Sequence, residues 1–140
     1  MTASHSGAFV FFGATGDLAY KQIFPALQAM VKHAHLDLPI IGVGRSNWNL
    51  GQLRDRARDS IEKHGGVDAD AFAKLSARLQ YVKGDLQDEA TYEQLRRALG
   101  SAVRPLHYLA IPPSMFERVT QGLAQSGCAQ DARVIIEKPF

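Results

Sequence analysis

The segment from Gly13 to Ala19, GATGDLA, carries residues whose types and spacing suit the binding of a phosphate group. It follows a short apolar run, residues 7–13, and precedes an amphipathic stretch. Glycine lets the backbone turn sharply and approach a pyrophosphate, and the partly positive N–H groups at a helix start favour an anion. Thr15 adds a hydroxyl donor, and Ala19 is small enough for the helix to lie close to a sheet. The pattern predicts a phosphate-binding turn. A plain tight connection stays the alternative, because the two glycines do not have the usual G-x-G-x-x-G spacing.

Asp17 belongs to the same turn, where its charge would oppose a bound phosphate. An acid early in a helix can cap neighbouring N–H groups and interacts favourably with the helix dipole. We therefore predict a structural role for Asp17 rather than that of a catalytic acid.

Arg45 ends the second apolar run, Leu38–Arg45, where NAD-binding domains usually place an acid that accepts a hydrogen bond from the ribose 2′-hydroxyl. No Asp or Glu occurs between Ile40 and Leu50. An arginine suits the 2′-phosphate of NADP instead. A charged hydrogen bond of about 1.5–3 kcal/mol would favour NADP by roughly ten- to a hundredfold. The alternative is an arginine that is simply solvated in a loop.

Two further apolar runs end in residues that could border a ligand. The fourth ends in Ala110-Ile-Pro112-Pro113, and consecutive prolines either form a stiff wall against which a flat ring can lie or merely end the strand. Lys138 ends the fifth run, where a lysine could hold a substrate phosphate or hydroxyl. A solvated pair of Lys138 with Glu137 is the other interpretation.

The elements that must position these residues alternate between buried strands and amphipathic helices. Strands are predicted at residues 7–13, 38–45, 79–86, 104–113 and 132–140, and helices at 17–35, 47–66, 68–79, 88–99 and 114–125. This order predicts an α/β fold: a doubly wound, Rossmann-like parallel sheet of strand order 3-2-1-4-5 with helices on both faces. Every residue singled out above lies at the carboxyl end of a strand, where such sheets bind ligands.

Three local features refine this prediction. Pro25 lies inside the first helical stretch and should kink that helix or limit it to its first two turns. The third run, LQYVKGDL, alternates apolar and polar residues, which indicates a strand near a sheet edge. Asp88 is a plausible N-cap for the helix that follows it.

Composition describes one ordinary globular domain over residues 1–140. The chain has 140 residues, 46% hydrophobic content, and 16 basic against 14 acidic residues for a net charge of +2. So even a balance gives no reason to expect nucleic acid or a membrane as a partner. No membrane span or secretory signal is visible, and the one cysteine, Cys128, fits a reducing compartment and a partly buried apolar position, so we expect a cytoplasmic protein. The five histidines do not converge, so we expect no metal site.

Taken together, the motifs resemble the coenzyme domain of the glucose-6-phosphate dehydrogenase family. They are FFGATGDLAYKQIFPAL, GVGRS, YLAIPPSMF and VIIEKPF, in that order, and they cover Phe9 to Phe140. The resemblance implies NADP-dependent oxidation of D-glucose 6-phosphate at C1 to the lactone, at the entry to the pentose phosphate pathway, by an enzyme that is a homo-oligomer. It also implies the cofactor-binding residues: Gly13, Ala14, Thr15, Gly16, Asp17 and Leu18 at the pyrophosphate turn, Arg45 and Ser46 at the 2′-phosphate, Tyr108, Ala110 and Pro112 beside the nicotinamide, and Lys138. Lys138 would also bind the substrate, and the Lys138–Pro139 bond would be the cis bond of the family.

The chain departs from the family in two places. Where the family commonly has two basic residues after GDLA-x, this chain has Lys21 and Gln22, which puts substrate affinity or identity in question. The catalytic histidine base of the family and its large β+α substrate domain lie downstream of Phe140. The chain therefore resembles a coenzyme domain that we expect to bind NADP weakly and, alone, to oxidise nothing.

Two alternatives belong to other classes. A non-catalytic NADP-binding module would also lack a base. The atypical short-chain reductases use GATG-x-x-G, but in this chain Ala19 replaces the third glycine. Those enzymes also generally need Tyr-x-x-x-Lys, and none of Tyr20, Tyr81, Tyr92 and Tyr108 has a lysine four residues on.

Overall fold

Five parallel strands form the centre of the fold, in the order β3-β2-β1-β4-β5. The computed structural model describes residues 7–34 and 36–136. The strands are β1 (Phe9–Phe12), β2 (Ile40–Gly44), β3 (Leu79–Lys83), β4 (Leu106–Leu109) and β5 (Arg133–Ile136). The helices are the π-helix η1 (Ala19–Ile23), α1 (Phe24–His33), α2 (Leu50–Lys63), α3 (Ala69–Arg78), α4 (Glu89–Leu99), the 3-10 helix η2 (Pro113–Met115) and α5 (Phe116–Ser126). The predicted fold class and strand order are confirmed.

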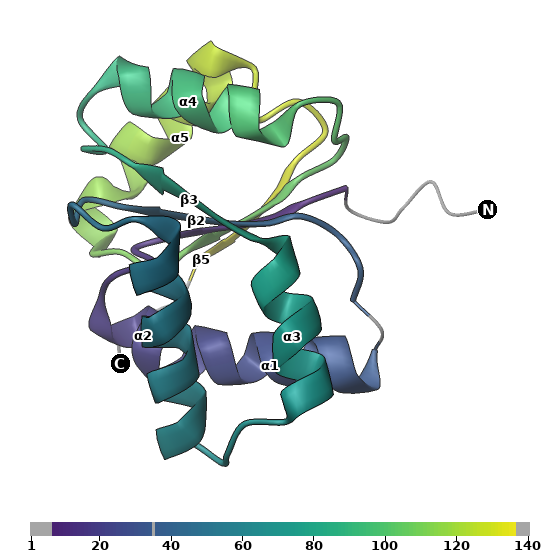
Figure 1. Cartoon of the computed structure of the whole chain (residues 1–140). Helices are drawn as coiled ribbons and strands as arrows, with labels where there is room; N and C mark the ends of the chain where they lie inside the picture. The colour runs from purple at the N-terminus through teal and green to yellow at the C-terminus, as the bar shows by residue number, and fades with distance from the viewer. Residues whose placement is uncertain (1–6, 35, 137–140) are drawn as a thin grey trace.

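The helices form a layer on each face of the sheet. Figure 1 shows α1, α2 and α3 below the sheet and α4 and α5 above it. The alternation of β1 explains the two layers: Phe9 and Phe11 join the core under α1 to α3, whereas Val10 and Phe12 join the core under α4 and α5. All four residues are buried because both faces of this central strand are covered.

The first helix passes through Pro25 instead of ending near it. Residues 17–33 are helical throughout, but residues Ala19–Ile23 form a π-turn in which the Phe24 N–H donates to the Ala19 carbonyl. Pro25 then lies in the first turn of α1, where a missing N–H costs little. The wider turn before the proline accommodates the ring, so the prediction that Pro25 limits the helix to two turns is wrong.

Side-chain caps define the starts of three other helices. Asp88 caps α4 by accepting a hydrogen bond from the Ala90 N–H at 3.0 Å, as predicted. Asp68 does the same for α3. Asn49 and Gln52 form a reciprocal capping box at the start of α2. The Asn49 cap fixes the point at which the loop after β2 enters α2, and the Asp88 cap does the same for the loop between β3 and α4.

The two outer strands differ in how much of their surface is covered. β3 is an edge strand, as its alternating sequence predicts, and its apolar residues face the two cores. β5, at the other edge, exposes Val134, Ile135 and Ile136 by 42%, 41% and 46%. Successive strand residues point to opposite faces, so both faces of β5 are open to solvent. Within the described residues, no helix is both long and apolar enough to cross a bilayer.

Candidate dinucleotide-binding groove

An open groove of about 1020 Å³ lies beyond the carboxyl ends of β1, β2, β3 and β4. The strand order reverses between β1 and β4, so this is the switch point at which open α/β sheets bind ligands. The volume is at the upper end of the range for small-molecule sites. The groove is lined by Gly13, Thr15, Gly16, Val43, Gly44, Arg45, Ser46, Asp85, Leu86, Gln87, Ala110, Ile111, Pro112, Ser114 and Met115.

Gly13 fits its place in the groove only because it has no side chain. Its φ is +85°, in the left-handed region, and a Cβ there would overlap the Ala110 carbonyl oxygen of the neighbouring strand end. The Gly13 and Ala14 N–H groups both donate to the Val43 carbonyl, at 2.9 and 3.0 Å. The glycine turn is therefore tied to β2 on one side and pressed against the end of β4 on the other.

Gly16 marks the start of the first helix. Its carbonyl accepts the Tyr20 N–H at 3.2 Å, and its own N–H donates to the Gly13 carbonyl at 3.0 Å. Of the residues that the structure describes, only Gly13 would have an atom near a Cβ on Gly16, its oxygen at 3.4 Å, so they leave the space above the turn open. The first N–H groups of this helix, from Asp17 on, have no partner within the helix and are available to an anion. This is the arrangement that the sequence predicts for a pyrophosphate.

The three other predicted residues of this segment lie differently. Ala14 is fully buried, and its Cβ packs where Gly42 leaves room, 2.9 Å from a Cβ built on that glycine. Leu18 packs against the core under α1 to α3. Neither side chain lines the groove, so these two residues can contribute only backbone groups. The Asp17 carboxylate is exposed and accepts no hydrogen bond from the described residues, so the predicted cap is not formed, although its place in the first turn still favours the helix dipole.

The loop after β2 joins the glycine turn directly. The Ser46 hydroxyl donates to the Thr15 hydroxyl oxygen at 3.0 Å, and the Ser46 carbonyl accepts both the Trp48 N–H at 2.8 Å and the Tyr81 hydroxyl at 2.6 Å. Arg45, one residue earlier, is exposed and lines the groove. The predicted partners of a 2′-phosphate, Arg45 and Ser46, therefore lie beside the predicted pyrophosphate turn.

The end of β4 forms the opposite wall. Ala110 and Pro112 line the groove, and the Met115 N–H donates to the Pro112 carbonyl at 2.9 Å as the chain enters η2. Both prolines thus follow the end of the strand, and Pro112 also borders the groove, whereas Pro113 begins η2. Tyr108 lies on the α1 face of the sheet, with its ring 6.3 Å from that of Phe9, and it is not among the groove-lining residues. Lys138 and the Lys138–Pro139 bond lie outside the described residues.

Sequence reasoning missed a third side of the groove, formed after β3 by Asp85, Leu86 and Gln87. The Asp85 carboxylate accepts the Gln87 N–H at 2.8 Å, and the buried Tyr92 hydroxyl holds the Leu86 carbonyl at 2.7 Å. Their position could have identified them, because these residues follow a strand, as the other groove residues do. Among the described residues, no group of three or more His, Cys, Asp or Glu side chains is placed to hold a metal ion.

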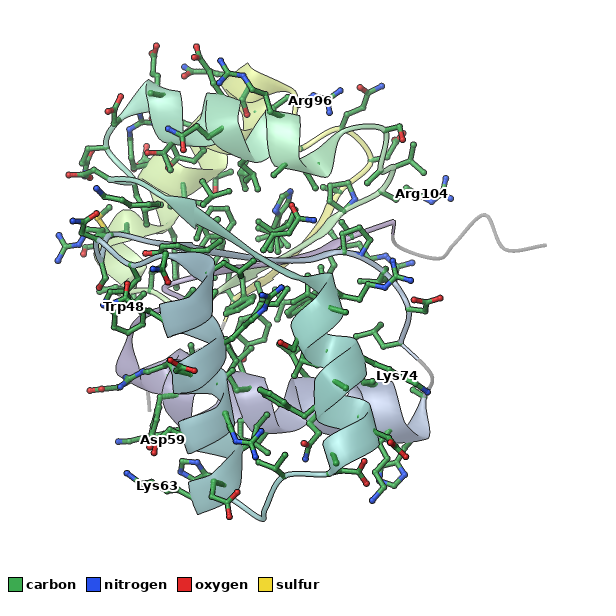
Figure 2. All side chains as sticks on the ribbon, in the orientation of Figure 1. Trp48, Asp59, Lys63, Lys74, Arg96 and Arg104 are labelled. Atoms are coloured by element: carbon green, nitrogen blue, oxygen red, sulfur yellow. The ribbon has the colours of Figure 1, made fainter. Side chains whose placement is uncertain are left out.

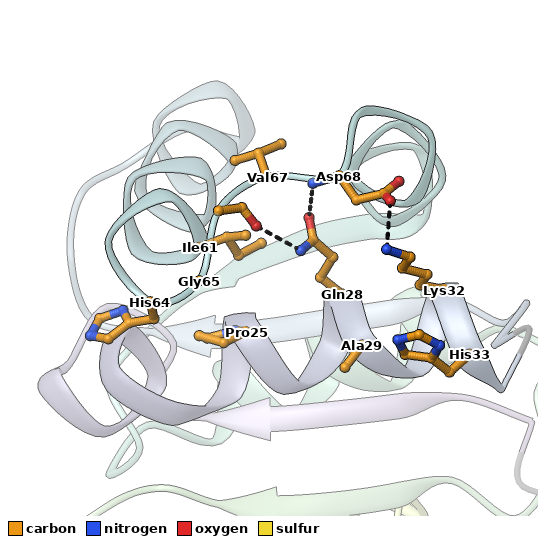
Figure 3. Close-up of a pocket in the computed structure, with 11 residues that line it drawn as sticks. Pro25, Gln28, Ala29, Lys32, His33, Ile61, His64, Gly65, Val67 and Asp68 are labelled. Carbon is orange, nitrogen blue, oxygen red and sulfur yellow. Dashed lines mark hydrogen bonds and ion pairs between the residues drawn. The ribbon is translucent and has the colours of Figure 1, made fainter.

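A second hollow, of about 410 Å³, lies in the helical layer between α1 and the connection from α2 to α3. Figure 3 shows Gln28 and Lys32 pointing from α1 toward this connection. The Gln28 side chain donates to the Gly66 carbonyl at 3.1 Å and accepts the Asp68 N–H at 3.0 Å, and Lys32 pairs with Asp68 at 3.0 Å. These contacts hold the helices together, and they give the hollow a structural explanation.

A third set of contacts joins α2 to the π-turn, outside the groove. The Tyr20 hydroxyl donates to Asp59, which also pairs with Lys63 at 3.4 Å, and Figure 2 shows Asp59 and Lys63 along α2 below Trp48. The hydrogen bond from Tyr20 lowers the pKa of the Asp59 carboxyl below its ordinary value. The Arg56 guanidinium lies 4.3 Å from the centre of the Tyr20 ring and 6.0 Å from that of Trp48.

Comparison with known proteins identifies the family. Residues 10–140 match the family described as "Glucose-6-phosphate dehydrogenase, NAD binding domain". Glucose-6-phosphate 1-dehydrogenase 1 of Mycobacterium tuberculosis is 43% identical over 96% of this chain and 29% of its own length. The crystal structure of glucose-6-phosphate 1-dehydrogenase from Mycobacterium avium superposes with a TM-score of 0.90 at 42% identity, over 97% of this chain and 30% of that chain. A glucose-6-phosphate dehydrogenase described in complex with its substrate glucose-6-phosphate gives a TM-score of 0.82 at 30% identity, over 95% of this chain and 30% of that one.

The chain thus spans less than a third of the length of the relatives it matches. The matched segment contains the glycine turn, the β2 loop and the end of β4, which are the groove features described above. The fold, the position of the groove and the family match agree, and the chain belongs to the family of NAD-binding domains of glucose-6-phosphate dehydrogenase.

Proposed function

We propose that this chain binds NADP in the groove and serves as the coenzyme domain of an enzyme that oxidises D-glucose 6-phosphate at C1 to the lactone. The relatives named above are glucose-6-phosphate dehydrogenases, and one solved relative is described with that substrate. When bound, the coenzyme accepts a hydride from the sugar. The residues of this chain bind and orient the coenzyme and shield one of its faces from water.

The observation that carries the choice of NADP is the place of Arg45. It lines the groove directly after β2, one residue before Ser46, whose hydroxyl is bonded to Thr15 of the glycine turn. A pyrophosphate at the turn would put the adenosine ribose near this loop. The acid that lines the groove, Asp85, comes from the next strand, and its carboxylate is engaged by the Gln87 N–H. Arg45 itself is exposed and takes part in none of the ion pairs formed among the described residues, so its guanidinium is available to a 2′-phosphate.

We assign the remaining predicted contacts in the same way. Tyr108, Ala110 and Pro112 are proposed to border the nicotinamide side, and Lys138 is proposed to contact both the coenzyme and the sugar phosphate. Gln22, which is exposed on the π-turn, replaces a basic residue common in the family and is expected to weaken substrate binding. The complete enzyme is proposed to be a cytoplasmic homo-oligomer.

Coenzyme titration tests the proposal. Oxidised NADP and NAD are titrated calorimetrically into the unmutated chain, into Arg45→Ala, and into Arg97→Ala as a matched loss of charge on α4. We expect the unmutated chain and Arg97→Ala to bind NADP about tenfold or more tightly than NAD, and Arg45→Ala to lose this preference. Equal affinities in the unmutated chain would refute the choice of NADP, and binding of neither coenzyme would refute the function itself.

The chain alone is expected to produce no NADPH from glucose 6-phosphate. Hydride transfer from the C1 hydroxyl needs a base placed near its proton. Among the groove-lining residues of the described chain, the ionisable side chains are Arg45 and Asp85. His107 is fully buried on the α4 face of the sheet and cannot reach a ligand in the groove. Measurable turnover, followed by NADPH absorbance, would contradict this expectation.

A further inference from the structure

The edge strand β3 holds the loop after β2 at two points. Tyr81 and Lys83 are two residues apart and therefore point to the same face of the sheet. The Tyr81 hydroxyl donates to the Ser46 carbonyl at 2.6 Å, and the Lys83 ammonium donates to the Asn47 side-chain oxygen at 2.9 Å. Both contacts fall within two residues of Arg45, the residue proposed to meet the 2′-phosphate.

Of these two hydrogen bonds, the one from Tyr81 restricts the loop after β2 more strongly. The Ser46 carbonyl that accepts its hydroxyl also accepts the Trp48 N–H at 2.8 Å, so both of its acceptor positions are used within the loop and its neighbour. Partial burial raises the pKa of the Tyr81 hydroxyl, which stays a neutral donor at physiological pH. Lys83, by contrast, is exposed.

A glycine makes room for this contact. A Cβ on Gly44 would lie 3.2 Å from the Tyr81 hydroxyl and 3.1 Å from the Thr15 methyl group. Because Gly44 has no side chain, Tyr81 and Thr15 can both approach the end of β2. The Tyr81 hydroxyl donates to the Ser46 carbonyl, and the Thr15 hydroxyl accepts from the Ser46 hydroxyl. The orientation of Ser46 is thus fixed at both ends.

We propose that Tyr81 is a positioning residue that sets the preference for NADP over NAD by holding the Arg45–Ser46 segment in its binding conformation. The inference rests on the proposed function. A preordered loop loses less conformational entropy when a 2′-phosphate binds. NAD has no 2′-phosphate, so it gains nothing from the order of this loop. Loss of the Tyr81 hydroxyl should therefore weaken the binding of NADP and leave that of NAD unchanged.

The test titrates NADP and NAD into the unmutated chain and into Tyr81→Phe, with Tyr20→Phe as the matched control. The Tyr20 hydroxyl also donates a hydrogen bond to a partner on another element, Asp59, but lies outside the groove. We expect Tyr81→Phe to reduce the NADP-to-NAD affinity ratio about three- to tenfold, the effect of one hydrogen bond, and Tyr20→Phe to preserve that ratio. Because both coenzymes are measured on the same sample, a loss of folded protein lowers both stoichiometries and not the ratio.

The double variant Arg45→Ala/Tyr81→Phe shows whether Tyr81 acts through the loop. If it does, Tyr81→Phe has little further effect on the ratio once Arg45 is removed. An unchanged ratio in Tyr81→Phe, or an equal loss of affinity for both coenzymes, would overturn the inference while the NADP preference of the unmutated chain still stands. If the unmutated chain itself shows no preference for NADP, the proposed function fails first.

Discussion

The side-chain hydroxyl groups of Thr15 and Ser46 lie 3.0 Å apart and share a hydrogen bond, although one residue follows β1 and the other follows β2. The turn proposed for the pyrophosphate and the loop proposed for the 2′-phosphate are therefore one connected structure. Substitutions in this region separate effects on folding from effects on binding.

Gly13→Ala is expected to destabilise the fold. The alanine would have to keep the left-handed backbone of Gly13, which costs about 1–2 kcal/mol for a residue with a side chain. Its Cβ would also overlap the Ala110 carbonyl oxygen. We expect a total loss of roughly 3 kcal/mol or more in the free energy of unfolding, measured by urea denaturation. A loss below about 1 kcal/mol would mean that the ends of β1 and β4 separate easily.

Gly16→Ala is expected to change coenzyme binding more than the stability of the fold. Its φ is not in the left-handed region, and in the described part of the chain the one atom near a Cβ is the Gly13 oxygen at 3.4 Å, so the free energy of unfolding should change by less than about 1 kcal/mol. The methyl group would, however, occupy the open space in front of the helix start. We expect about a tenfold or greater loss of affinity for both NADP and NAD, measured by calorimetry. Unchanged affinity would place the phosphates elsewhere.

The NADP preference should depend on salt through Arg45. This side chain is exposed, so its attraction to a 2′-phosphate is screened as the Debye length falls from about 10 Å at 0.1 M salt to about 3 Å at 1 M. We expect the NADP-to-NAD affinity ratio to fall several-fold over this range in the unmutated chain and to stay flat in Arg45→Ala. A ratio that is equally salt-dependent in both proteins would assign the preference to another cation.

His107 should make the fold sensitive to acid. Its Nε2 lies 2.8 Å from the Cys128 carbonyl, which requires a proton on Nε2, and its buried Nδ1 has no hydrogen-bond partner among the described residues. Burial lowers the pKa of His107, so below pH about 6.5 the unfolded chain binds a proton that the folded protein does not. Stability is thus fully present above that pH and falls below it, by up to about 1.4 kcal/mol per pH unit until the folded-state pKa is reached.

Urea denaturation between neutral and mildly acidic pH measures this dependence. His107→Gln, which keeps a donor for the Cys128 carbonyl, should flatten the fall in stability, whereas the exposed control His33→Gln should retain the slope of the unmutated protein. If His107→Gln and the unmutated protein lose stability in parallel, another group is responsible.

Much of the fold follows from the pattern of apolar residues. All four residues of β1 are apolar, and all four are buried, as expected for a strand covered on both faces. The strand order follows from the alternation of strands and helices, which leaves few right-handed arrangements. The π-turn could not be predicted, since Pro25 favours an early end of the helix and only tertiary packing of Phe24 and Leu27 carries the helix past it.

Site residues could be predicted from the sequence where their role follows from residue type and position. They could not be predicted where the role depends on a contact between different strands. Gly13 and Arg45 could be found from their types and places in the sequence. The contribution of Tyr81 depends on the distance between its hydroxyl and the Ser46 carbonyl, which are 35 positions apart in sequence. The side chains of Ala14, which is buried, and Leu18, which is partly buried, likewise could not be separated by sequence from the groove residues beside them.

The hydrogen bond from the Trp48 N–H to the Ser46 carbonyl gives the loop after β2 an optical label of its own. Trp48 is the one tryptophan of the chain, and its indole is partly buried, 6.0 Å from the Arg56 guanidinium. The emission of an indole depends on the polarity and the charges around it. The tryptophan fluorescence of this chain therefore comes from the segment that is proposed to select the coenzyme, and a rearrangement of Arg45 and Ser46 that changes the surroundings of Trp48 can be followed in solution without an added dye.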